Sequence, residues 1–294
     1  MLYEPTQFEP LIEEPWIPAR VEDAIAAIVS DADAAFDQEV LWPAHQWDAR
    51  DQPLPLQSLY AGAAGVIWAL DELRRRGRAE TSLDLAAAAT RTLELKRAAP
   101  DFAWDEHYHP ASLFCGETGP LLVAIRLAPE PALADELLGL VRANVANRTD
   151  DISWGMPGTI LAALAMHEWT AEERWLQVAR ESAVALRACR GEDGLWRQDD
   201  DYRGFTAMHG AAGNTLALLR VELDDALAGE TAAVLARHAF THDGLANWPG
   251  TPRPQLARPR DGRICLQFCT GAPGVLAASW EYLDEALVLA GAEL

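Results

Sequence analysis

Residues 58–70, SLYAGAAGVIWAL, place two glycines three positions apart at the start of an apolar stretch. We call this pattern a glycine phrase, and the chain holds five, with first glycines 54, 39, 55 and 61 residues apart. The others are SLFCGETGPLLVAIRLA (112–128), SWGMPGTILAALAMH (153–167), MHGAAGNTLALL (208–219) and QFCTGAPGVLAASW (267–280). Repeats of this length are typical of arrays of helical hairpins.

Amphipathic stretches separate the glycine phrases. Their apolar residues recur at helical spacing with charges on the other face, which predicts helices. These helices are expected over roughly 21–39, 81–97, 131–147, 171–188 and 224–240. The glycine-led stretches carry almost no charge in their first two turns, so we expect those helices to be buried. No stretch predicts a strand, and the chain is therefore predicted to be all-α.

The paired glycines predict how the helices meet. They remove side chains from one face of a helix start, so that neighbouring backbones can approach closely. If all these starts point to one end, they surround a funnel lined with free backbone N–H groups. This arrangement is an α/α toroid; an open helical solenoid with the same internal pattern is the alternative. We expect one toroid domain over 21–294, after an extended arm over 1–20 that contains four prolines.

Composition limits the partners and the compartment. The formal net charge of −21 would repel nucleic acid and anionic membrane surfaces. No apolar run approaches the roughly 20 residues that span a bilayer. The N-terminus is acidic and proline-rich, unlike a signal peptide. Four cysteines without such a signal predict reduced thiols in the cytoplasm, with Cys189 as a small core residue.

Two phrases carry a chemically active residue just before their first glycine. His209 directly precedes Gly210, and Cys269 stands two residues before Gly271. A helix N-terminus favours the thiolate form of a cysteine, which binds metal or attacks an electrophile. A histidine can exchange a proton near pH 7. Inert packing of the cysteine and a hydrogen-bonded core histidine are the alternatives, but two such residues on adjacent repeats favour a shared pocket.

The longest segment without periodicity is 241–263, which leads into the last glycine phrase. Long ordered loops are often functional. A basic lip beside a candidate site could capture a carboxylate, and a plain surface connection is the alternative. Four arginines would form this lip: Arg253, Arg258, Arg260 and Arg263.

The phrases resemble those of the lanthionine synthetase C-like family, which includes lantibiotic cyclases and eukaryotic glutathione-binding relatives. MHGAAGN matches the family's His-Gly-x-x-Gly phrase, and QFCTGAPGV matches its Trp-Cys-x-Gly-x-Pro-Gly phrase with Phe268 for Trp. SLYAGAAGVIWAL and SLFCGETGPLLVA resemble its first two inner helices. The resemblance covers about residues 55–285 and implies an α/α toroid of seven hairpins.

The resemblance also implies a reaction. Family members bind one zinc ion, which activates a thiol as thiolate. The thiolate adds to dehydroalanine or dehydrobutyrine and forms a thioether, after which a histidine protonates the enolate. Carried over, Cys269 is a zinc ligand and His209 the general acid. Substrates would be peptides or small thiols, and Glu117 would have a structural role.

The chain departs from the family where the remaining zinc ligands are expected. No Cys-His-Gly phrase follows Cys269, and only 25 residues remain. The site is therefore predicted to be incomplete, and the chain could be inactive. Three explanations stay open: the chain is part of a longer protein, it is a relative that has lost zinc, or other ligands such as Cys265 or Cys115 are recruited.

Two other functions compete with thioether formation. One is a metal-free module that binds a peptide or glutathione on the same fold, consistent with Thr270 in place of the family's frequent His. The other is a carbohydrate enzyme on a similar α/α fold, using eleven tryptophans as sugar platforms and Asp199, Asp200 and Asp201 as acid and base. The scattering of the tryptophans through the chain argues against the carbohydrate enzyme.

Overall fold

The computed structural model describes Leu2 and residues 15–45, 55–199, 202–252 and 265–294. The range predicted as one domain, 21–294, is divided between two compact units: Leu11–Leu140, and Met1–Pro10 together with Val141–Leu294. Most of the predicted arm over 1–20 lies outside the described residues. Its end is helical, because a helix begins at Pro18.

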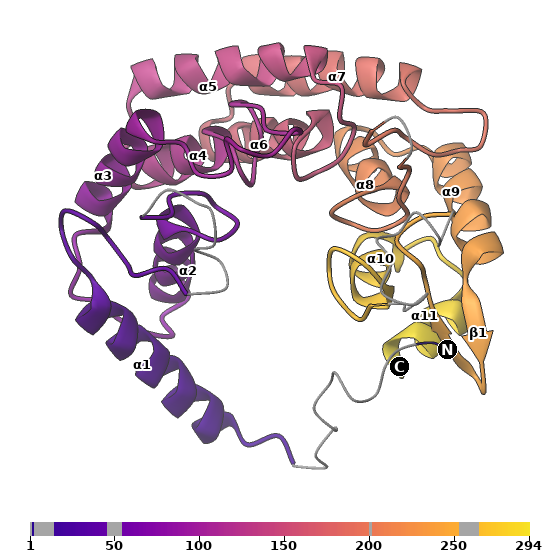
Figure 1. Cartoon of the computed structure of the whole chain (residues 1–294), viewed down its shortest axis with the longest axis horizontal. Helices are drawn as coiled ribbons and strands as arrows, with labels where there is room; N and C mark the ends of the chain where they lie inside the picture. The colour runs from indigo at the N-terminus through magenta and orange to yellow at the C-terminus, as the bar shows by residue number, and fades with distance from the viewer. Residues whose placement is uncertain (1, 3–14, 46–54, 200–201, 253–264) are drawn as a thin grey trace. The chain divides into compact units, whose positions relative to one another are not determined.

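The unit Leu11–Leu140 contains helices joined by loops in its described part. Helix α3 packs against both α2 and α4, and α2 also contacts α4. Asp84 caps α3 by accepting a hydrogen bond from the backbone N–H of Ala87. The helices are α1 (Pro18–Ala35), α2 (Ala63–Arg75), α3 (Leu85–Ala98), α4 (Thr118–Leu127) and α5 (Pro131–Ala143), the last running into the second unit (Figure 1).

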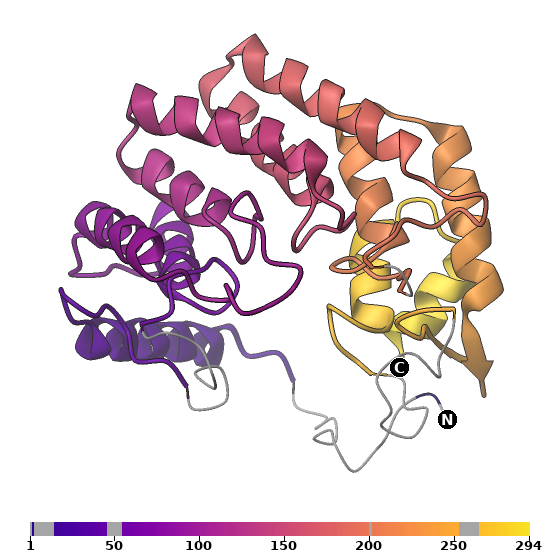
Figure 2. The same ribbon diagram turned by 45° about the horizontal axis from the view of Figure 1, so that its top comes forward.

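The second unit continues the pattern of neighbouring helices. Helix α6 lies against α7 and α8, and α8 also contacts α9 and α10 (Figures 1 and 2). Asp224 and Asp284 cap the helices that follow them. The elements are η2 (Asn144–Ala146), α6 (Met156–Thr170), α7 (Glu173–Ala188), α8 (Ala211–Val221), α9 (Asp225–His238), β1 (Phe240–His242), β2 (Leu245–Asn247), α10 (Ala272–Ser279) and α11 (Glu285–Ala292).

The prediction of an all-α protein is confirmed, and the predicted burial of the glycine-led helices holds for α4 and α8. All but two of the ten residues of α4 are buried, as are most residues of α8. Helices α3, α7 and α9, which follow glycine-led helices, carry exposed charged faces instead. This alternation is consistent with an all-α toroid of helical hairpins.

The prediction that no strand occurs is wrong at one place. β1 and β2 form an antiparallel hairpin in which His242 pairs with Leu245. The two residues between them, Asp243 and Gly244, both have positive φ angles of 50° and 82°. This is the backbone of a two-residue hairpin turn, for which Asp-Gly is a favoured sequence. The hairpin follows directly after α9, at its lower end in Figure 2.

Candidate functional site

Each glycine phrase is preceded by a tight loop that folds over the start of its helix. A Cβ atom on Gly213 would lie 1.8 Å from the carbonyl oxygen of Ala207. A Cβ atom on Gly274 would lie 1.9 Å from that of Phe268. In both cases the obstructing carbonyl belongs to the residue six positions earlier, so only glycine leaves room for the loop.

The loop carbonyls accept hydrogen bonds from the first N–H groups of the helix. The expectation of free N–H groups at the helix starts is therefore wrong for α8, because the backbone satisfies them. The same arrangement is present at the start of α2, where Ala63 and Ala64 donate to Leu56 and Gln57. At α8, Ala211, Ala212 and Gly213 donate to Gly204, Phe205 and Thr206 at 3.0, 3.0 and 3.2 Å.

A polar side chain four residues before the first glycine fastens several of these loops. Its oxygen accepts a hydrogen bond from the N–H of the residue that directly precedes the glycine. Asp151 Oδ1 accepts from Trp154 at 2.7 Å, and Thr206 Oγ1 accepts from His209 at 3.3 Å. Ser58 has the same role in the first phrase. In the third and fourth phrases this residue makes a second contact, and these contacts build the candidate site.

The second contact of Asp151 is with the predicted general acid. Asp151 Oδ2 lies 2.8 Å from Nδ1 of His209. The Asp151 side chain is 1% exposed and that of His209 31% exposed, so the pair extends from the interior to the surface. Because an ionised carboxylate only accepts hydrogen bonds, Nδ1 carries the proton. Among the described residues, no hydrogen bond involves the Nε2 atom, and the His209 side chain is partly exposed.

The second contact of Thr206 connects the phrases of His209 and Cys269. Its hydroxyl donates a hydrogen bond to the carbonyl oxygen of Cys269 at 2.6 Å while accepting from the N–H of His209. Thr206 is fully buried. The backbones on which the two predicted site residues stand are thus joined through one side chain, and the structure brings both residues into one region.

Asn247 holds the start of α10 beside this region. Its Oδ1 atom accepts a hydrogen bond of 2.7 Å from the N–H of Ala272, the first residue of α10. Its Nδ2 atom donates to the carbonyl oxygens of Leu2 and Cys265 at 2.8 and 3.3 Å. The hairpin of β1 and β2 therefore positions the cysteine phrase through one buried amide.

Tyr202 lies close to both Asp151 and Cys269. Its hydroxyl donates a hydrogen bond to the carbonyl oxygen of Gly250 at 3.1 Å. Burial raises the pKa of Tyr202 to about 12, and negative charge on Asp151, Cys269 and Asp199 contributes to the increase. Tyr202 therefore remains a protonated hydrogen-bond donor at physiological pH.

Asp150 is a second carboxyl group next to the orienting aspartate. Burial raises its pKa to about 7; the charge of Arg197 opposes this shift, and that of Asp151 adds to it. Its backbone carbonyl accepts hydrogen bonds from Asn214 and Gln198. The side chain of Asp150 therefore gains or loses a proton near pH 7.

The zinc site implied by the resemblance remains a prediction that the described residues do not test. Within the ranges that the structure describes, no group of three or more His, Cys, Asp or Glu side chains could hold a metal ion. The Sγ atom of Cys269 lies 3.5 Å from the amide oxygen of Gln267. Cys265 is exposed, and Cys115 is buried in the other unit. Cys269 as a zinc ligand remains a prediction.

Other predicted residues have different outcomes. Cys189 is exposed rather than part of the core, because it stands at the C-cap of α7, beyond the helix's buried face. Glu117 stands at the N-cap of α4, and its Oε2 atom lies 3.7 Å from Nε of Arg97. Asp199 accepts the N–H of Tyr202 and so supports a loop. Six predicted residues lie outside the described residues: Asp200, Asp201, Arg253, Arg258, Arg260 and Arg263.

Comparison with protein families agrees with this architecture. The model of the family "Lanthionine synthetase C-like protein" matches residues 55–290, which is most of the chain. The chain therefore belongs to the lanthionine synthetase C-like family. A comparison with curated proteins gives no match. Among the described residues, no helix combines the length and the apolar character that crossing a membrane requires.

Proposed function

We propose that the chain catalyses the addition of a thiol to a dehydroalanine or dehydrobutyrine residue, with His209 as the proton-transfer group. The hydrogen bond between His209 and the buried Asp151 carries the proposal. It is the arrangement of an oriented acid–base histidine, and its second nitrogen makes no hydrogen bond to the described residues.

The proposed reaction balances without a further reactant. The Nε2 atom of His209 accepts the proton of the substrate thiol, and the sulfur forms a bond to the β-carbon of the dehydroamino acid. The electron pair of the broken π bond moves toward the carbonyl and forms an enolate. His209 then returns the proton to the α-carbon, which yields the thioether. Asp151 holds the ring in one orientation and stabilises the transient imidazolium.

The substrates that fit this chemistry are a dehydroamino acid in a peptide and either a cysteine of that peptide or a small thiol such as glutathione. We also propose a cytoplasmic location, because the four cysteines are free and a reducing compartment preserves free thiols. Family membership supports the proposal at the level of the reaction class.

The test is an addition assay with a peptide that contains one dehydroalanine and an excess of glutathione. Mass spectrometry detects a mass gain of one glutathione. We expect His209→Asn to lower the rate by about 100-fold or more, the range of general acid–base catalysis. The control His242→Asn changes an exposed histidine and should keep the wild-type rate.

The assay is run with and without added zinc, and zinc content is measured by elemental analysis. A rate no higher than that of the uncatalysed addition under both conditions would reject the enzyme proposal. Calorimetry with the same peptide and with glutathione then separates the alternative, because tight binding without product formation identifies a metal-free binding module.

A further inference from the structure

A run of arginines stands at the end of α2. Residues 74–78 read RRRGR, so four of the 24 basic residues of a chain with net charge −21 fall within five positions. Arg126, near the end of α4, joins them in space. We call Arg74, Arg75, Arg76, Arg78 and Arg126 the arginine cluster. It lies at the C-terminal ends of two helices whose N-terminal ends carry glycine phrases.

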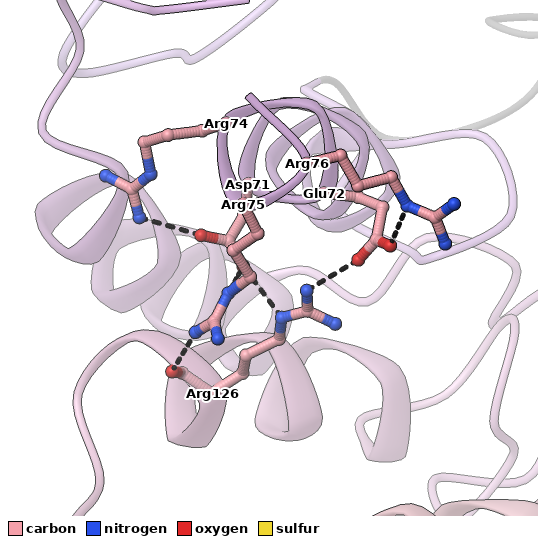
Figure 3. A network of polar contacts seen from close by, with 6 residues as sticks. All are labelled: Asp71, Glu72, Arg74, Arg75, Arg76 and Arg126. Carbon is pink, nitrogen blue, oxygen red and sulfur yellow. Dashed lines mark hydrogen bonds and ion pairs between the residues drawn. The ribbon is translucent and has the colours of Figure 1, made fainter. Parts of the chain in front are cut away.

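Two neighbouring carboxylates hold four members of the cluster together, all except Arg78, as Figure 3 shows. Asp71, which is 1% exposed, accepts hydrogen bonds from Arg74, Arg75 and Arg126, each at 2.7 Å. Glu72 accepts from Arg76 at 2.5 Å and from Arg126 at 2.6 Å. Burial alone would raise the pKa of Asp71, but the arginine hydrogen bonds lower it, and the carboxylate stays ionised.

The carboxylates leave an excess of positive charge and of hydrogen-bond donors. The network of Figure 3 contains four arginines and two acids, and Arg78 adds a further charge. Each guanidinium offers five N–H donors. Arg74 and Arg76 each use one, and Arg75 uses two. The side chains of Arg74, Arg75 and Arg76 are 42%, 52% and 70% exposed, so all three lie at the solvent-accessible surface.

Helix capping does not account for this excess. Positive side chains stabilise a helix C-terminus, and one or two arginines in the last turn are common for that reason. Within the described residues, however, only one bond from Arg74, Arg75 or Arg76 reaches a helix-end carbonyl, from Arg75 to Arg126 at 3.4 Å. The remaining bonds of these three arginines serve to fix their guanidinium groups relative to one another.

We propose that the arginine cluster is a docking surface for an acidic peptide segment of a partner protein. Fixed guanidinium groups with open donors bind carboxylates in a bidentate manner and lose little side-chain entropy on binding. The negative net charge of the chain favours the cluster over other surfaces as the binding site of an acidic segment. Acidic segments are repelled elsewhere and attracted here, so an acidic partner would dock in one orientation.

Nucleic acid fits the cluster less well than an acidic peptide. Single strands bind through aromatic platforms as well as positive charge. The aromatic ring within the network is that of Trp68, and the guanidinium of Arg126 covers it at 4.3 Å from the ring centre. The proposal is independent of the thiol addition proposed above.

The test uses the full chain and a fluorescein-labelled peptide of ten glutamates, with binding measured by fluorescence anisotropy at 0.1 M salt. A peptide of ten glutamines is the uncharged comparison. The double variant Arg76→Gln/Arg78→Gln removes two exposed charges without touching Asp71. Arg180→Gln/Arg220→Gln removes two exposed charges from α7 and α8 and is the matched control.

We expect the glutamate peptide to bind at least tenfold more tightly than the glutamine peptide. The Arg76/Arg78 variant should bind the glutamate peptide about five- to tenfold more weakly than the wild type, as expected for two exposed charge pairs. The control variant should bind it as tightly as the wild type. Equal binding of the two peptides, or equal losses in the two variants, would overturn the proposal. Tighter binding of a twelve-nucleotide single strand than of the glutamate peptide would also overturn it.

Discussion

The Nδ1 atom of His209 lies 2.8 Å from a carboxylate oxygen of Asp151, which precedes it by 58 residues. The two residues belong to loops before different helices, α8 and α6, that pack against each other. Asp151 also accepts the N–H of Trp154 and is thereby fixed in its own loop. The orientation of the histidine is therefore set by a residue that the loop itself holds rigid.

The first prediction concerns this pair. Asp151→Asn keeps the bond from Trp154, but its amide can donate to Nδ1 of His209 and select the other tautomer of the ring. We expect the rate of thiol addition to fall by about two orders of magnitude with little loss of stability. Asp193→Asn, an exposed change, is the control. A variant that retains half or more of the wild-type rate would contradict the assigned role of Asp151.

The second prediction concerns the link between the two phrases. Thr206→Val preserves the shape of the side chain but leaves the carbonyl of Cys269 and the N–H of His209 without their partner. We expect a loss of about 1–3 kcal/mol in the free energy of unfolding, measured by urea denaturation. Thr206→Ser retains the hydroxyl and should lose clearly less. Equal losses for the two variants would show that the hydroxyl does not connect the phrases.

The third prediction tests the packing of the glycine phrases. Gly213→Ala would place a methyl group 1.8 Å from the carbonyl oxygen of Ala207, so the loop must move. We expect a loss of about 3 kcal/mol, the upper end of overpacking costs. Gly229→Ala in α9 meets no atom within 4 Å. It should stabilise the protein by about 0.5–1 kcal/mol because alanine favours the helix. Thermal unfolding of both variants measures the two stability changes. Equal changes would show that the loop carbonyl does not restrict the residue at position 213.

The fourth prediction concerns a fully buried ion pair in the unit Leu11–Leu140. The Nζ atom of Lys96 lies 2.5 Å from Asp101 Oδ1 and from the carbonyl oxygen of Cys115. Asp101 Oδ2 accepts the N–H groups of Gln57 and Ser58, so the pair joins the first two glycine phrases.

Lys96→Met should cost about 3–5 kcal/mol of unfolding free energy, because it leaves a buried carboxylate without its countercharge. Arg97→Met breaks the solvent-accessible pairs of Arg97 with Glu136 and Glu117 and should cost at most about 1 kcal/mol. Urea denaturation of the two neighbouring variants gives the comparison. A loss for Lys96→Met no larger than that for Arg97→Met would disprove a structural role of the pair.

The fifth prediction is a pH dependence. The pKa of Asp150 is raised from 3.8 to about 7 in the folded protein. Between these values the unfolded chain has released this proton and the folded chain still holds it. The contribution of Asp150 to stability therefore falls as pH rises from about 4 to 7 and is constant above.

Asp150→Asn removes this titration. The stability of the variant relative to wild type should therefore improve between pH 5 and pH 8, by about 1–3 kcal/mol. Urea denaturation at both pH values measures this change, and Asp193→Asn again serves as the control. A stability difference that is the same at pH 5 and pH 8 would show that the carboxyl is not perturbed.

Only part of the candidate site could be predicted from the sequence. His209 and Cys269 stand out because they lie one and two residues before a glycine, whereas Asp151 and Thr206 lie four residues before one. That position is polar in all five phrases: Ser58, Ser112, Asp151, Thr206 and Gln267. Comparing the phrases at this position could have drawn attention to Asp151 and Thr206. The dipeptide Asp243-Gly244 could also have predicted the β-hairpin, because Asp-Gly favours a two-residue hairpin turn.

The sequence by itself determined the helical class, the alternation of buried and amphipathic helices, and the family. These follow from periodicity and from glycine spacing, which are properties of local stretches. Only the tertiary structure decided which residues meet. The bond between Asp151 and His209, the bridge of Thr206 to Cys269 and the closure of the helix starts by loop carbonyls join separate segments. Such contacts depend on how loops pack against each other, which no local pattern specifies.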